Sequence, residues 1–213
     1  DQPRSRGLGD VYKRQGEDGA THQCNEDIAL MRTIPGMVIL NPSDDIEAKA
    51  AVKAAYEHEG PVYMRFGRLA VPIINDRPDY KFEIGKGVTL REGKDVAIIA
   101  TGLCVSESLA AAEKLAADGI DAKVINIHTI KPLDEDLVVA AAKECGKVVT
   151  VEEHSVIGGL GSAVCETLSR KAPTPVKTIG VQDCFGESGP AVALLEKYGL
   201  NAEGIYASVK EFV

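Results

Sequence analysis

Two patterns of apolar positions alternate along this chain. Short runs rich in β-branched residues predict buried strands, and stretches whose apolar positions recur every three to four residues predict amphipathic helices. Strands are predicted at 37–40, 62–65, 96–100, 122–127, 148–152 and 176–180, and helices near 43–59, 105–116, 134–145, 162–169, 190–198 and 202–212. Such alternation predicts parallel strands, right-handed crossovers and helices packed on the sheet. The fold class is therefore α/β.

A break in the pattern divides the chain into two parts. Residues 69–83 lose their periodicity and gain Pro72, Pro78 and several aspartates, as is typical of a linker. Before it, Ser43 is the expected N-cap of the helix over 43–59, which Gly60-Pro61 should end. We expect one α/β piece over 16–82 and a second over 83–213, with a mainly parallel sheet in an autonomous domain from about residue 84.

Composition and charge exclude several classes of protein. The 213 residues are 45% hydrophobic and carry a formal net charge of −8, which disfavours partners rich in phosphate such as nucleic acids and anionic membranes. No apolar run is long enough to span a bilayer. The five cysteines contain no C-x-x-C pair, so neither a zinc site nor a disulfide framework is indicated. Reduced thiols in a cytoplasmic protein fit best.

Residues 1–15 differ from the rest of the chain. The run from Ser5 to Gln15 resembles the in-frame translation of a sequencing adapter, so we expect a non-native leader followed by a truncated native sequence from about Gly16. A natural basic arm or targeting peptide is the alternative. A secretory signal is not indicated, because the segment lacks an apolar core and a small-residue cleavage site.

The segment Gly16-Glu17-Asp18-Gly19-Ala20-Thr21-His22-Gln23 carries the strongest candidate chemistry. It sets a carboxylate, Asp18, and an imidazole, His22, four residues apart in a glycine-containing loop. Glycine lets a backbone approach a ligand closely, and histidine exchanges a proton near neutral pH. Taken alone, however, the segment could equally be a polar turn.

Further motifs follow the loop in a fixed order. They are Asn25–Arg32, Ile34–Met37, Asn41–Asp44, Gly60–Arg68 and Glu152–His154. Together with the loop they resemble the transketolase family of thiamine-diphosphate enzymes, and most closely the C-terminal subunit of split transketolases. The resemblance runs from Gly16 to Val213. It implies the last part of a pyrimidine-binding domain over 16–82 and a transketolase C-terminal domain over 83–213.

The resemblance implies a reaction and roles for the loop residues. Transketolases move a two-carbon ketol unit between sugar phosphates, as in the pentose phosphate pathway. His22 aligns with a catalytic histidine that contacts substrate oxygens, and Asp18 aligns with an aspartate that binds a hydroxyl of the donor sugar. Ala20 stands where the family usually has proline, which removes a restraint on φ but no functional group.

Two arginines are candidate substrate ligands. Arg65 and Arg68 form an R-x-x-R pair at the end of a predicted strand, and guanidinium groups bind phosphate bidentately. Arg68 matches the phosphate-binding arginine of the family, whereas Arg65 has no counterpart there. Two solvated arginines at a strand end are the plainer interpretation.

The glycines at 158–161 follow Glu152-Glu153-His154 and precede a predicted helix. They could cradle a phosphate, but the spacing of a dinucleotide-binding motif and its acidic companion are missing, so a tight strand-to-helix turn is favoured. We expect His154 near a subunit interface, and His58 and His128 to be surface or packing residues.

Some of the family's machinery is missing from this sequence. The Gly-Asp-Gly motif that carries the Mg²⁺ ligands and the diphosphate site does not occur, and the glutamate that activates the cofactor would lie upstream. We therefore predict no metal ligands here, and thiamine diphosphate with Mg²⁺ held partly by an N-terminal subunit or domain. We also predict a dimeric or heterotetrameric assembly and a fragment that is inactive alone.

Two alternatives stay open. A fragment of 1-deoxyxylulose-5-phosphate synthase would share the loop, although Gly16-Glu17 and the run Asn25–Arg32 favour transketolase. A non-catalytic assembly module related to a 2-oxoacid dehydrogenase β-subunit is the interpretation from another class. Convergence of Asp18, His22 and Arg68 on one cleft would favour the enzyme.

Overall fold

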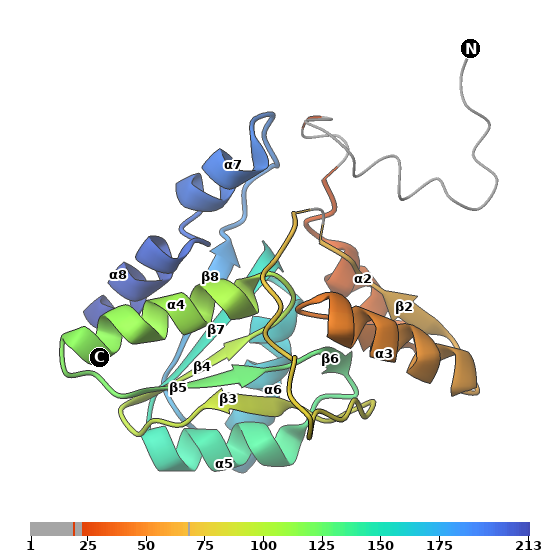
Figure 1. Cartoon of the computed structure of the whole chain (residues 1–213), viewed down its shortest axis with the longest axis horizontal. Coiled ribbons are helices and arrows are strands. Elements are labelled where there is room, and N and C mark those ends of the chain that lie inside the picture. The colour runs from red at the N-terminus through yellow and green to blue at the C-terminus, as the bar shows by residue number, and fades with distance from the viewer. Residues whose placement is uncertain (1–18, 20–22, 68) are drawn as a thin grey trace.

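The computed structural model describes residue 19, residues 23–67 and residues 69–213 (Figure 1). The expected leader and the candidates Asp18, His22 and Arg68 lie outside the described residues. The helices are α2 (Asp27–Arg32), α3 (Asp45–Glu57), α4 (Cys104–Ala117), α5 (Glu135–Cys145), α6 (Leu160–Lys171), α7 (Ala191–Lys197) and α8 (Ala202–Phe212). The strands are β1 (Val38–Leu40), β2 (Val62–Met64), β3 (Val88–Arg91), β4 (Val96–Ala100), β5 (Ala122–Asn126), β6 (Thr129–Lys131), β7 (Val148–Ser155) and β8 (Val176–Val181).

The larger sheet has five strands in the order β3-β5-β4-β7-β8. Strands β5, β4, β7 and β8 are parallel, and β3 adds an antiparallel edge. The predicted α/β fold with a mainly parallel sheet is therefore confirmed. Alternate residues of β4 face opposite layers: Ile98 packs in the core with α4 and α8, and Ile99 packs in the core with α5 and α6 (Figure 1). Burial on both faces explains why these strands are almost entirely apolar.

A smaller sheet has the order β2-β1-β6. Strand β1 is parallel to β2 and antiparallel to β6, which lies beyond the linker in sequence. Ile39 of β1 packs with Ile28 of α2 and Ile130 of β6, whereas Leu40 packs with Ala51 of α3. The two parts of the chain are therefore joined, because β6 belongs to a sheet built mainly by the first part, and an autonomous domain from residue 84 stays a prediction.

The local predictions also need two corrections. The N-cap of α3 is Asp44, whose side chain accepts from the Glu47 amide, and not Ser43. Ser43 instead donates its amide and its hydroxyl to the Glu47 carboxylate. Three short elements, α2, β3 and β6, were missed, because six residues or fewer hold too little of either period to be recognised. Residues 69–83 contain no helix or strand, as expected of a linker.

Two features of the described residues bear on the sequence predictions about membrane spans and cysteines. No helix among them is both long enough and apolar enough to cross a membrane. All five cysteines lie in the described part of the chain and are free thiols, two of them buried.

Candidate functional site

Arg65 is a buried ion-pair residue between the two parts of the chain. Only 7% of it is exposed, and its Nε donates to the Asp27 carboxylate at 3.0 and 3.2 Å. Its Nη2 donates to the carbonyl oxygens of Cys24 and Glu153, at 3.0 and 2.8 Å. Burial alone would lower the pKa of Arg65, but the carboxylates of Glu153 and Asp27 outweigh it and hold the pKa above its ordinary value. These contacts tie β2, α2 and β7 together.

The hydrogen bonds that the Arg65 guanidinium already makes do not suit it to bind a phosphate group. Its Nε and Nη2 already donate to protein oxygens, and its Nη1 lies 3.5 Å from the Glu153 carboxylate. A phosphate would have to displace these acceptors in a buried setting, at the cost of leaving them unpaired. We therefore do not propose Arg65 as a substrate-binding residue.

His154 lies fully buried between β7 and α2. Its Nδ1 donates to the Ser155 carbonyl oxygen at 2.6 Å, so its Nε2 is free to accept from the Ala29 amide at 3.4 Å. Burial lowers the pKa of His154, in agreement with this neutral tautomer. Its observed role is to hold the start of α2 on β7. His128 is likewise a packing residue, stacked on Phe82 with ring centroids 4.2 Å apart.

The glycine turn at 158–161 is filled by the chain's own carboxylate. Glu152 is fully buried, and its two oxygens accept from the amides of Leu160 and Gly161 at 2.7 and 2.8 Å. A Cβ on Gly159 would lie only 2.0 Å from Glu152 Oε2, so that position needs glycine. Burial raises the pKa of Glu152 to about 7, although the two amides act in the opposite direction. The segment is a strand-to-helix turn, and its N-terminal amides are not open to a phosphate.

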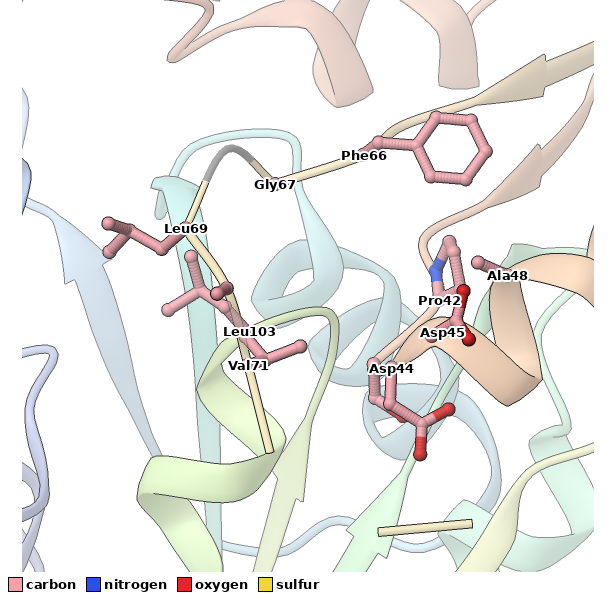
Figure 2. Close-up of a pocket in the computed structure, with 11 residues that line it drawn as sticks. Pro42, Asp44, Asp45, Ala48, Phe66, Gly67, Leu69, Val71 and Leu103 are labelled. Carbon is pink, nitrogen blue, oxygen red and sulfur yellow. The ribbon is translucent and has the colours of Figure 1, made fainter. Parts of the chain in front are cut away.

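A pocket of about 330 Å³ lies between the start of α3, the residues that follow β2 and the start of α4 (Figure 2). Gly67 and Leu69, the sequence neighbours of Arg68, both line it. One wall is acidic, with Asp44 and Asp45 from the start of α3. The remaining lining residues are mostly apolar and come from both parts of the chain: Pro42, Ser43, Ala48, Phe66, Ala70, Val71 and Leu103. An anionic substrate here would therefore need a nearby cation, and Arg68 is the candidate in sequence.

The acidic wall is held in place by the linker. Asp44 Oδ2 accepts from the amides of Ile74 and Asn75, at 2.8 and 2.7 Å. Burial would raise the pKa of Asp44, but these amides and that of Glu47 outweigh it, so the pKa lies below its ordinary value. Behind it, the buried Glu47 accepts from Tyr80 of the linker and from Asn126 of β5. The pocket is thus built on a rigid network of carboxylates.

The residues after His22 lie against the C-terminal part of the chain. Gln23 Nε2 donates to the Glu187 carbonyl oxygen at 2.7 Å. A Cβ added to Gly19 would lie 2.9 Å from Ser188 Oγ, so the same segment also adjoins the described residue of the loop. Sequence reasoning missed the segment 186–189. Its run Gly186-Glu187-Ser188-Gly189 between a strand and a helix was the signal that could have found it.

The described residues do not contain a set of side chains that could hold a metal ion. They contain no group of three or more His, Cys, Asp or Glu side chains placed to hold an ion. The amides of Leu160 and Gly161 at the start of α6 already bind Glu152. Convergence of Asp18, His22 and Arg68 on one cleft stays a prediction, because all three lie outside the described residues. We therefore assign no described residue to thiamine diphosphate or Mg²⁺.

Comparison with known families settles where this chain belongs. Residues 14–73 match the family described as "Transketolase, pyrimidine binding domain", and residues 85–205 match "Transketolase, C-terminal domain". The chain belongs to the transketolase family. The family resemblance drawn from the sequence is thus confirmed, with the two domain types in the expected order.

Individual members of the family agree with this assignment. A 6-deoxy-6-sulfo-D-fructose transketolase subunit from Clostridium sp. (strain MSTE9) is 47% identical over 194 residues, covering 91% of this chain and 60% of that protein. A 1-deoxy-D-xylulose-5-phosphate synthase 1 from Geobacter sulfurreducens is 40% identical over 203 residues, covering 93% of this chain and 32% of that protein.

A solved structure described as "Split gene transketolase, inactive beta4 tetramer" matches with a TM-score of 0.84 and 49% identity. That match covers 90% of this chain and 62% of the other. The chain therefore spans about three fifths of the length of the transketolase subunits that it matches.

Proposed function

We propose that this chain is the C-terminal portion of a thiamine-diphosphate-dependent transketolase that moves a two-carbon ketol unit between ketose and aldose phosphates. The observation that carries the proposal is the ordered match to both transketolase domain families, with transketolase subunits among the most similar proteins. The loop Gly16–Gln23 then supplies the residues suited to the chemistry.

Three residues act on the substrate in this proposal. His22 donates a hydrogen bond to the substrate oxygen that gains negative charge, which is the type of contact that contributes most to such catalysis. Asp18 accepts from a hydroxyl of the donor sugar, and Arg68, whose sequence neighbours Gly67 and Leu69 line the pocket of Figure 2, binds the phosphate. The cofactor, when bound, supplies the carbanion that attacks the ketose carbonyl.

The active site is completed by a second polypeptide or domain. We propose that an N-terminal subunit or domain supplies the diphosphate site and the Mg²⁺ ligands in a dimeric or heterotetrameric assembly, and that the glutamate that activates the cofactor belongs to the pyrimidine-binding domain. The description of the similar split-gene protein as an inactive tetramer of one subunit type supports this division of labour. We accordingly expect the purified 213-residue chain to have no ketol-transfer activity. A reduced, cytoplasmic setting suits its free thiols.

The test is product analysis of the complete protein assembled with its N-terminal subunit. With thiamine diphosphate and Mg²⁺, a ketose phosphate donor and an aldose phosphate acceptor should give the products of two-carbon transfer. Supplying pyruvate with glyceraldehyde 3-phosphate tests the second candidate, since a 1-deoxyxylulose-5-phosphate synthase is also among the relatives. Formation of 1-deoxyxylulose 5-phosphate, or of no product from any donor, would overturn the proposal. The second result would favour the assembly module.

A further inference from the structure

The segment that follows His22 is held by groups from distant parts of the sequence. Gln23 donates its side-chain amide to the Glu187 carbonyl oxygen at 2.7 Å, across 164 positions of sequence. Figure 1 shows the connection between β8 and α7 reaching toward the chain that precedes α2. The fit is close, because a Cβ on Gly186 would lie 2.1 Å from Gln23 Oε1.

The next two residues, Cys24 and Asn25, also form hydrogen bonds with distant parts of the chain. The Cys24 carbonyl oxygen accepts from Arg65 Nη2, which also donates to the Glu153 carbonyl oxygen on β7. The Asn25 carbonyl oxygen accepts from the Ser155 amide at 2.7 Å, at the end of the same strand.

The helix that follows is anchored to the same region. Arg32 of α2 donates to the Gly158 carbonyl oxygen and to the Glu166 carboxylate, each at 2.7 Å. Hydrogen bonds from a charged guanidinium are about twice as strong as neutral ones. Residues 23–25, which follow the loop, and helix α2 are therefore hydrogen-bonded to β7, to the turn after β7, and to the connection from β8 to α7.

We propose that the C-terminal part of the chain serves the reaction as a frame that positions the loop bearing Asp18 and His22, with Gln23 and Arg65 as positioning residues. This inference rests on the proposed function. Gln23 directly follows His22 in sequence, so a change in the contacts of Gln23 can act on His22 through a single peptide bond. A misplacement of about 1 Å can cost roughly a hundredfold in rate, so holding the loop exit matters for turnover.

Gly186→Ala tests the frame without removing any group from it. Gly186 does not have a positive φ, so alanine is compatible with its backbone, and the new methyl meets the end of the Gln23 side chain. Gln23 must then move and give up its hydrogen bond to Glu187. Gly189→Ala is the matched control in the same connection, because a Cβ there meets Leu194 at an ordinary 3.5 Å.

In the complete assembled enzyme, Gly186→Ala and Gln23→Ala should each lower kcat by about tenfold to a hundredfold with little change in KM or Tm. Gly189→Ala should match the wild type. Because both substitutions break one contact, Gly186→Ala should add little in a Gln23→Ala background. Arg65→Lys should lower kcat too, since one ammonium cannot replace the planar fork that bridges Asp27, Cys24 and Glu153.

Amide hydrogen exchange of peptides covering residues 19–25 gives a readout that does not depend on activity. Exchange should speed up in Gly186→Ala and Gln23→Ala and stay unchanged in Gly189→Ala. Wild-type exchange and wild-type kcat in the first two variants would overturn the inference. If instead the wild-type enzyme transfers no ketol unit, the proposed function fails, and so does the catalytic purpose of the frame. The exchange data would then still decide whether the frame holds the loop.

Discussion

At the scale of single residues, Glu152 supplies the hydrogen-bond acceptors that the start of a helix needs. Its carboxylate accepts hydrogen bonds from the amides of Leu160 and Gly161, which would otherwise lack partners at the start of α6. The sequence suggested a glycine turn there but not what fills it. A glutamate eight residues before a helix is not a recognisable capping signal in sequence. Glu152 reaches the amides of Leu160 and Gly161 only because the chain folds α6 back against β7.

The ionisation of Glu152 should make the stability of the chain depend on pH. Burial raises its pKa from 4.5 to about 7. Between these values the folded chain keeps a proton that the unfolded chain has lost, so the free energy of unfolding should fall as pH rises, by roughly 3 kcal/mol in total. Glu152→Gln cannot titrate, so its stability should vary less across this window. Urea unfolding at the two ends of the window measures both slopes. Equal slopes would contradict the prediction.

His22 is the residue whose replacement tests the loop most directly. If the proposed function holds, His22→Ala in the complete assembled enzyme removes a donor to the developing oxyanion. Turnover should fall by roughly 10²–10³, or about 3–4 kcal/mol, while cofactor affinity is kept. Steady-state kinetics with matched donor sugars and cofactor titration provide the measurement. Asp18→Ala is the companion variant, and it should chiefly weaken discrimination between stereoisomers of the donor. Near-wild-type turnover in His22→Ala would make the imidazole structural.

Residue type alone cannot separate Arg65 from Arg68, and only the family resemblance distinguishes them in sequence. Both belong to one R-x-x-R pattern, and chemistry alone allows either to bind phosphate. Arg65 is buried because α2 and β7 close over it and supply Asp27 and the Glu153 carbonyl oxygen. Those contacts span 38 and 88 positions of sequence, which no local pattern records.

At the scale of elements, the start of α3 and the linker form one unit. Asp44 caps the helix through the Glu47 amide and also accepts from Ile74 and Asn75. A segment that looks like a plain connection in sequence is therefore tied to a helix terminus, and the pocket wall depends on both.

Asp44→Ala should destabilise the chain by about 3 kcal/mol, because it removes a cap and leaves two further amides without their acceptor. Asp45→Ala is the control. Asp45 is exposed and pairs with Lys49 on the surface, so the change should cost less than about 1 kcal/mol. Since the folded pKa of Asp44 is depressed, its contribution should persist above the ordinary pKa and be lost as pH falls through the folded value. Urea unfolding of both variants checks this. Equal losses would contradict it.

The elements predicted best were those with the clearest local pattern. The prediction for β4 matches the observed bounds, and so does that for α8, because long apolar runs and clear amphipathic periods leave little choice. The missed β6 has only three residues, and its pairing with β1 depends on tertiary contacts. Local pattern thus predicted the four parallel strands of the large sheet, but neither its antiparallel edge β3 nor β6, which pairs with β1 of the small sheet.

At the scale of the whole molecule, β6 joins the two parts of the chain through its pairing with β1. Ile39 and Leu40 of β1 pair with Lys131 and Thr129, and the Asn41 amide donates to the His128 carbonyl oxygen. Loss of the large sheet would remove β6 and so expose an edge of the small one.

We therefore expect β1 and β4 to open together. In native-state hydrogen exchange, the slowest amides of the two strands should report the same opening free energy within about 1 kcal/mol. The amides of α7 serve as an internal control, because this helix has no buried residues and should open more readily. A much lower opening free energy for β1 than for β4 would show two independent units.

The strand shared between the sheets also bears on what happens when the backbone is cut. Asp76 and Asp79 are exposed in the linker, where a protease can reach the chain. After one cut there, the N-terminal fragment would keep β1 and the C-terminal fragment would keep its antiparallel partner β6. Each fragment would then hold half of a strand pair, together with half of the carboxylate network around Glu47. The nicked protein should stay together as a non-covalent complex, and separately produced fragments should find each other by complementation.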